Sequence, residues 1–216
     1  MEGAPPMAPE PEPREDPMIR ITRTSMLAAT LLGLSVGTAG AQSMHHGRSS
    51  NASLSGNPAV GGAAMLPTRD IVDNAVNSPD HTTLVAAVKA AGLVPVLKGE
   101  GPFTVFAPTN AAFAALPAGT VETLLEPRNK AALTGVLTYH VVAGKYDAAS
   151  IIAAIRNGGG RAMLTTVNGQ QLTAEMNGPR NVQLRDAKGN RIAISTYDVF
   201  QSNGVIHVVE KVLLPN

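Results

Sequence analysis

The sequence contains no cysteine and no tryptophan among its 216 residues. Without cysteine the chain can form no disulfide, cannot use a thiolate nucleophile and cannot bind a metal through sulfur. It also offers no cysteine for a lipid anchor at a signal cleavage site. Aromatic residues are few, with four Phe and three Tyr, so a core must consist mainly of Val, Leu, Ile and Ala. A domain of about 150 residues still buries well over half of its surface, which makes a core without disulfides feasible.

Residues 18–41 have the pattern of a secretory signal peptide. Two arginines precede an uncharged, mostly apolar run over residues 26–36, and Ala39 and Ala41 place small residues at the two positions that a signal peptidase reads. The alternative is a membrane anchor, but this run is shorter than the ~20 residues that cross a bilayer. We therefore expect cleavage after Ala41 and a periplasmic or extracellular protein, with membrane contact only through an uncleaved signal.

The segments on either side of the signal lack the apolar content of a folded domain. Residues 1–17 are rich in Pro and Glu, and we expect a disordered extension there unless translation begins at Met18. Residues 42–64 are rich in Ser, Gly, Asn and His and are expected to form a flexible tether. The folded domain is expected over residues 65–216.

Within this domain the apolar spacing changes from a helical to an alternating period. Start and stop signals such as Ser78-Pro79, Gly92 and Asp147 favour helices over 67–76, 79–91, 110–116, 120–125, 128–137 and 148–155. Strands are expected over 103–107, 139–142, 163–167, 171–176, 182–186, 191–196 and 205–214. Helices mainly in the amino-terminal half, followed by hairpins, indicate an α+β fold: a compact antiparallel β-sandwich-like core with several helices packed around it.

Three segments of the domain carry a family resemblance. The first is FTVFAPTNAAF over residues 103–113, the second is LTYHVV over residues 137–142, and the third is SNGVIHVVEKVLLP over residues 202–215. In order, spacing and identity they resemble the fasciclin-like (FAS1) domain family, in its secreted single-domain bacterial form. The resemblance covers residues 65–216 and implies a β-sandwich with helices around it and an extracellular adhesion function.

Most residues in the two long motifs are expected to support the fold. Pro108 ends a strand, and the Thr109 hydroxyl caps the helix that follows. Asn203-Gly204 supplies a tight turn before the last strand. The motif residues that we expect to be structural are Thr104, Phe106, Ala107, Pro108, Thr109, Asn110, Asn203, Gly204, Ile206 and His207.

The resemblance also makes Tyr139 and His140 the candidate partner-binding residues. It implies this role because a tyrosine–histidine pair at this place is associated with receptor binding at the cell surface in animal relatives. The alternative is a structural pair, in which a core histidine bonds to nearby backbone beside a packed aromatic ring. The apolar Val141 and Val142 that follow directly favour the structural role.

The sequence offers no constellation of residues that points to catalysis. The expected domain, residues 65–216, has no Gly-x-Ser-x-Gly nucleophile elbow; that spacing occurs only at residues 33–37, inside the expected signal peptide. The spacing of Ser195, Asp198 and His207 does not require them to meet. Metal-ligand spacings are absent as well. We therefore expect a protein that is not an enzyme, with no catalytic residue, no cofactor and no metal.

The expected function is that of an adhesion or interaction module with an extracellular or envelope protein or carbohydrate as partner. Basic residues are scattered and not paired with aromatics, so no nucleic-acid partner is expected. The alternative is carriage of an apolar small ligand such as a carotenoid, which some proteins with fasciclin-like domains bind. The Ala-rich helices would leave room for such a ligand, although no motif marks a groove.

Overall fold

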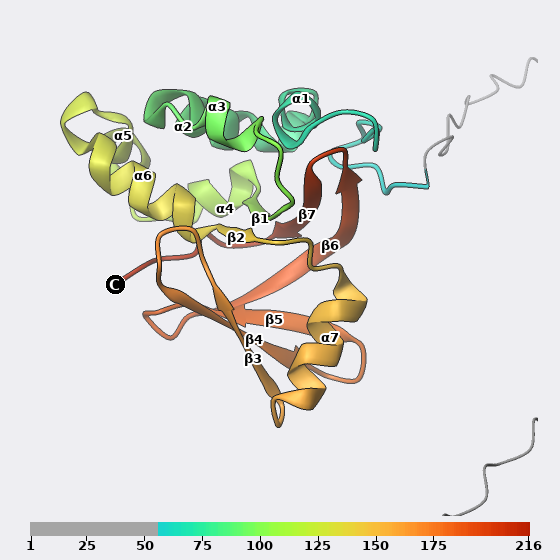
Figure 1. Cartoon of the computed structure of the whole chain (residues 1–216). Helices are drawn as coiled ribbons and strands as arrows, with labels where there is room; N and C mark the ends of the chain where they lie inside the picture. The colour runs from blue at the N-terminus through green and yellow to red at the C-terminus, as the bar shows by residue number, and fades with distance from the viewer. Residues whose placement is uncertain (1–55) are drawn as a thin grey trace, which may run out of the picture. The chain divides into compact units, whose positions relative to one another are not determined.

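The computed structural model describes residues 56–216, which form an α+β domain (Figure 1). Its helices are α1 (Ile71–Val76), α2 (Thr82–Ala91), α3 (Val94–Leu97), α4 (Asn110–Ala114), α5 (Thr120–Leu125), α6 (Lys130–Tyr139) and α7 (Ala148–Asn157), with 3-10 turns η1 (Pro79–His81) and η2 (Pro127–Asn129). Its strands are β1 (Phe103–Pro108), β2 (Val141–Ala143), β3 (Arg161–Thr165), β4 (Gln171–Asn177), β5 (Asn181–Arg185), β6 (Arg191–Gln201) and β7 (Gly204–Val209). The expected α+β class is confirmed, with the helices mostly in the first half of the domain.

The strands form one sheet in the order β2-β1-β7-β6-β5-β4-β3. All neighbouring pairs are antiparallel, as expected, except that β1 runs parallel to β7 with Phe103 opposite Gly204. The two edges meet through a bridge between Val142 and Thr166, and the Val167 amide donates to the Val141 carbonyl at 2.8 Å. The sheet is therefore close to a closed barrel.

Two hydrophobic cores lie on opposite sides of strands β1 and β7. The helix-side core lies against the amino-terminal helices and includes Val105, Ala107 and Ile206. The second core is enclosed by the sheet and α7, and it includes Phe106 and Val209. Consecutive residues of one strand thus enter different cores, which explains why β1 and β7 are apolar on both faces.

Helix ends follow the start and stop signals of the sequence at most positions. Thr109 and Asp147 accept hydrogen bonds from first-turn amides of α4 and α7, as predicted, and Gly92 ends α2 with φ of 73°. The first helix differs, because Asp70 caps it and it begins at Ile71 rather than at Pro67. Each such side-chain cap contributes about 1 kcal/mol.

Some predicted boundaries are wrong. The strand expected over residues 139–142 begins only at Val141, because α6 continues to Tyr139 and His140 is its C-cap. The last strand ends at Val209 rather than at Leu214. Helix α3 has four residues, too few for a period to show in the sequence.

The predicted flexible tether extends too far along the chain. Asn57 and Val60 are buried. The Asn57 amide group donates to the carbonyls of Phe200, at 2.6 Å, and Met65, at 3.2 Å, and the Phe200 amide donates back to Asn57 Oδ1 at 3.0 Å. Residues 57–64 therefore pack on the domain. The expected extension, the signal peptide and the rest of the tether lie outside the described residues.

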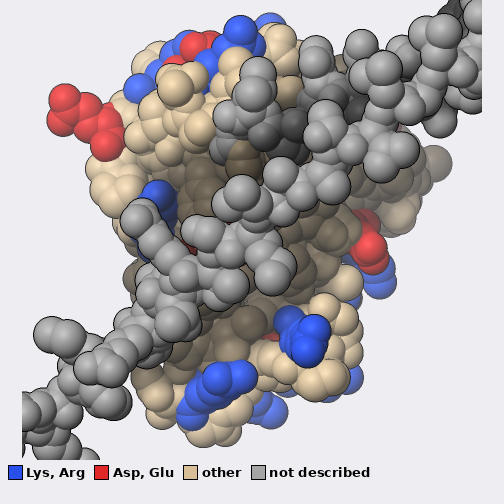
Figure 2. All heavy atoms as spheres, turned by 90° about the vertical axis from the view of Figure 1, so that its right-hand side faces the viewer, with Lys and Arg blue, Asp and Glu red and all other residues tan. Residues whose placement is uncertain are grey.

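Charges are unevenly placed over the domain. Residues 56–143 carry both acidic and basic side chains, whereas from Arg156 to Arg191 every exposed charged side chain is basic. Figure 2 looks onto the α7 side and shows Lys and Arg at the lower end, with acidic side chains mainly elsewhere. In the described part of the chain, no helix has the length and apolar character needed to span a bilayer.

Candidate functional site

Tyr139, the first candidate partner-binding residue, is fully buried at the end of α6. Its hydroxyl donates to the Gln171 carbonyl at 3.1 Å and accepts from the Ala187 amide at 2.9 Å. Burial raises the pKa of the phenol above its ordinary value, so the ring stays neutral at physiological pH. Tyr139 thus links α6 to β4 and to the turn after β5.

His140 is also buried and has both ring nitrogens engaged. Nδ1–H donates to the Val136 carbonyl at 2.8 Å, and the Leu213 amide donates to Nε2 at 2.9 Å. These partners require one neutral tautomer, with the proton on Nδ1. Burial lowers the pKa of the imidazole to about 4, and the Val136 carbonyl offsets this only in part. His140 therefore connects α6 to the carboxy-terminal segment.

Neither candidate can touch a partner while the domain is folded as described. No part of the Tyr139 side chain reaches the surface, and His140 is 2% exposed. A surface contact through this pair would require both rings to leave their buried positions. The structural alternative, which the apolar residues after the pair favoured, agrees with the hydrogen bonds of both rings.

The Asn203-Gly204 turn holds three parts of the helix-side core together. Asn203 Oδ1 accepts from the Ile71 amide at 3.1 Å, and its Nδ2 donates to the Leu97 carbonyl at 2.8 Å. A Cβ at Gly204 would lie 2.1 Å from the Phe103 carbonyl oxygen. Only glycine fits there, because any side chain would force β1 and β7 apart.

Asn110 and Thr104 make further links between segments distant in sequence. Asn110 Oδ1 accepts from the Thr83 amide at 2.9 Å and so joins α4 to the start of α2. Thr104 Oγ1 donates to the Gly144 carbonyl at 2.7 Å and accepts from the Tyr146 amide at 2.9 Å. The described contacts of these motif residues are all within the fold.

His207 lies in the sheet-enclosed region with its ring 5.7 Å from that of Phe106, centre to centre. Its Nε2–H donates to the Tyr146 carbonyl at 2.8 Å, and the Asp198 amide donates to Nδ1 at 3.3 Å. Burial lowers the pKa of this imidazole below its ordinary value. Like His140, it is a neutral core histidine with two backbone partners.

The possible Ser–Asp–His arrangement is not assembled as a proton relay. Ser195 Oγ donates to the Val208 carbonyl at 3.3 Å. The Asp198 carboxylate accepts from the Ala148 amide at 2.7 Å, and it is the Asp198 backbone that contacts His207. A nucleophile needs a base within hydrogen-bond reach, and the hydrogen-bond partners of these side chains are backbone groups instead.

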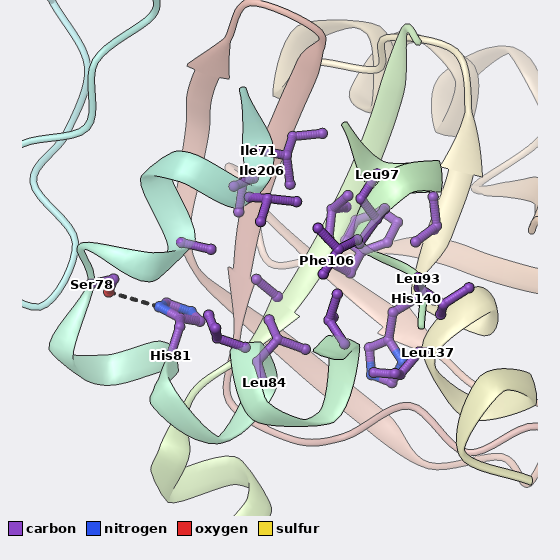
Figure 3. A pocket seen from close by; sticks show the side chains of 18 of the residues that line it. Ile71, Ser78, His81, Leu84, Leu93, Leu97, Phe106, Leu137, His140 and Ile206 are labelled. Atoms are coloured by element: carbon purple, nitrogen blue, oxygen red, sulfur yellow. Dashed lines mark hydrogen bonds between the residues drawn. The ribbon is translucent and has the colours of Figure 1, made fainter. Parts of the chain in front are cut away.

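A small cavity lies inside the helix-side core, between α1, α2, α3 and strands β1 and β7 (Figure 3). Its volume is about 60 Å³, and its lining is almost wholly apolar. The residues that line it include those labelled in Figure 3: Ile71, Ser78, His81, Leu84, Leu93, Leu97, Phe106, Leu137, His140 and Ile206. The space corresponds to about four to six water-sized spheres. It is far too small to enclose a carotenoid, so the carrier alternative gains no support here.

His81 is the unusual residue of this cavity. Its side chain is buried, with Nδ1 2.9 Å from Ser78 Oγ and with the Ala107 backbone as a further hydrogen-bonding neighbour of the ring. Burial lowers the pKa of the ring, so it remains neutral at physiological pH. Ser78 precedes η1, as its sequence predicts, but its hydroxyl makes no cap bond and contacts His81 instead. The sequence does not reveal this contact, because a Ser three residues before a His has no distinctive pattern.

Among the described residues no three His, Asp or Glu side chains come together as possible metal ligands. The arrangement of the buried polar residues therefore points to support of the fold.

Comparison with known proteins agrees with this arrangement. The Fasciclin domain family model matches residues 79–215. The chain is 49% identical over 156 residues to protein sll1483 of Synechocystis, covering 72% of this chain and 79% of that protein. It is 30% identical over 212 residues to the cell surface glycolipoprotein MPB83 of Mycobacterium bovis, covering 95% of this chain and 82% of that one.

A solved structure also has the same fold. It is a FAS1 domain pair from the insect cell adhesion molecule Fasciclin I, with a TM-score of 0.61 and 17% identity. The match covers 69% of this chain and 52% of that structure, so the chain spans about half of the pair. On the family match and the sequence identity together, the chain belongs to the fasciclin domain family.

Proposed function

We propose that this domain is an adhesion module that works outside the cytoplasm and binds protein or carbohydrate partners without catalysis. The observation that carries the proposal is that the side chains best suited to acid–base chemistry are buried and hydrogen-bonded within the fold. Tyr139, His140 and His207 are buried, and their polar atoms bond to backbone groups. Groups so placed stabilise a scaffold, and binding is left to the surface.

The names of similar proteins support this assignment at the level of class. One relative is called a cell surface glycolipoprotein, and the solved structure comes from a cell adhesion molecule. The signal-like pattern of residues 18–41 supports export. We expect the mature protein to begin at Gln42.

A pull-down tests this function directly. The protein starting at Gln42 is immobilised and exposed to extracellular and envelope fractions of its source, and retained protein and carbohydrate are analysed separately. The proposal predicts specific retention of at least one component that an unrelated protein of equal charge does not retain. Retention no greater than on that control would overturn it.

A further inference from the structure

The outer face of strands β3 to β6 has features that the fold alone does not require. Side chains alternate along these strands, and the inward set packs under α7 in the sheet-enclosed core. The outward set includes Arg161 on β3, Arg185 on β5 and Arg191 on β6, all exposed. Because α7 packs on the inward side, it leaves these arginines facing solvent. We call this surface the arginine face.

The acidic residues of this region are withdrawn from the surface. Glu175 is buried between two arginines, with Arg191 Nε at 3.3 Å and Arg161 Nε at 3.9 Å. Its Oε1 also accepts from Gln183 Nε2 at 2.8 Å. Asp186 is buried as well. One carboxylate thus serves two guanidinium groups, and the face keeps an excess of positive charge.

Arg185 contributes a positive charge that no acidic side chain of the described domain balances. In the β5–β6 register it lies directly opposite Arg191, and like charges in such a cross-strand pair destabilise a sheet. No ion pair or hydrogen bond of the Arg185 side chain occurs within residues 56–216. An external anion between the two guanidinium groups would remove the repulsion.

The geometry of the face selects among anionic partners. Guanidinium groups bind carboxylates and sulfates through paired hydrogen bonds. Arg161, Arg185 and Arg191 lie on three different strands of one sheet. Because neighbouring strands are about 4.8 Å apart, a repeating polyanion that crosses the strands can meet more than one of these arginines. No aromatic side chain stands in the outward set of β3, β4 and β5, so nucleic-acid bases find no stacking platform.

We propose that the arginine face binds an acidic polysaccharide, a sugar polymer carrying carboxylate or sulfate groups. This inference rests on the proposed adhesion function and gives it a partner class. Recognition is through charge, with Arg185 as the free contact and Arg161 and Arg191 as contacts shared with Glu175. Added salt weakens such binding, because the charges are exposed.

The test measures binding of the whole exported protein to immobilised dextran sulfate, with neutral dextran as the matched surface. We expect the wild-type protein to bind dextran sulfate but not neutral dextran, and the binding to weaken as salt is added. Arg185→Gln weakens it about two- to fivefold, in keeping with one exposed charge contact, and Arg185→Lys restores most of the loss. The control is Arg128→Gln, which removes the same charge from an exposed side chain of η2 and leaves binding unchanged.

Three results would overturn the inference. They are no binding to dextran sulfate, equal weakening by Arg128→Gln, and equal affinity for duplex DNA of the same charge density. The melting temperature of Arg185→Gln, expected to equal or exceed that of wild type, excludes unfolding as the cause of a loss. A protein that fails here but still retains envelope components in the pull-down would lose this partner class and keep the adhesion function.

Discussion

The imidazole of His140 shows how surroundings decide the role of a residue. The sequence places a histidine beside an aromatic residue in a recognisable motif, which could serve either binding or packing. Burial and two backbone partners make it a neutral structural link. The following Val141 and Val142 were the only local sign of this, because apolar neighbours indicate burial.

Replacing either residue of this pair is expected to destabilise the domain. His140→Ala leaves the Val136 carbonyl and the Leu213 amide unpaired, which costs about 1–3 kcal/mol of unfolding free energy. Tyr139→Ala removes a fully buried ring and costs about 3–5 kcal/mol. Denaturant unfolding measures both values. Unchanged midpoints together with lost adhesion would instead make the pair a recognition site.

Acidification should destabilise the domain, with His140 as a main cause. Its pKa falls from an ordinary 6.5 to about 4 on folding. Between these two pH values the unfolded chain binds a proton that the folded domain excludes, so stability is complete above pH 6.5 and falls as pH drops toward 4. Complete protonation of the unfolded chain over this pH range would lower the unfolding free energy by about 3 kcal/mol. His81 and His207 act in the same direction, since burial lowers their pKa too.

The variant His140→Gln isolates this contribution. Because Gln does not titrate, the variant should lose clearly less unfolding free energy than wild type between pH 7 and pH 4.5. Denaturant unfolding at the two pH values gives the comparison. An identical pH dependence in both proteins would show that His140 is not the group responsible.

At the scale of elements, local sequence signals predict that a helix or strand is present better than they predict where it begins and ends. The caps Thr109 and Asp147 and the stop at Gly92 appear where the sequence places them. Their physics is local, so a few adjacent residues suffice. The strand predicted over residues 139–142 failed because α6 continues to Tyr139, where burial of the ring depends on strands far along the chain.

The segment before α1 differs from the expected tether for the same reason. Its composition is that of a tether, yet Asn57 finds its partners on Phe200 in β6. Removing residues up to Ala64 should therefore lower the unfolding free energy by about 2–3 kcal/mol, through lost burial of Val60 and unpaired backbone groups. A protein beginning at Gly56 is the control and should match the longer chain. Equal melting of the version beginning at Met65 would show that the segment is dispensable.

The close approach of β1 and β7 gives a second prediction for this scale. Gly204→Ala places a methyl group 2.1 Å from the Phe103 carbonyl and should lower the unfolding free energy by at least about 2 kcal/mol. Gly135→Ala is the matched control, because a Cβ there meets nothing within 4 Å inside α6. It should be neutral or stabilise by about 0.5–1 kcal/mol. The prediction fails if both variants melt alike.

At the scale of the whole molecule, period and order of elements were enough for the α+β class. The parallel pairing of β1 with β7 and the near closure of the sheet were not predicted. Both features join segments that are distant along the chain. An alternating pattern predicts a strand but does not predict which other strand pairs with it. The arginine face is not evident from the sequence either, because strand register brings scattered basic residues together and Glu175 becomes buried between two of them.

The central claim, that this fasciclin domain acts by adhesion through its surface, is tested most directly by bead retention. Beads coated with the protein from Gln42 onward are settled on cells of its source and washed under fixed flow. The account predicts that far more coated beads than uncoated ones remain, and that soluble protein competes them away. Retention equal to that of beads coated with an unrelated protein of the same charge would contradict it.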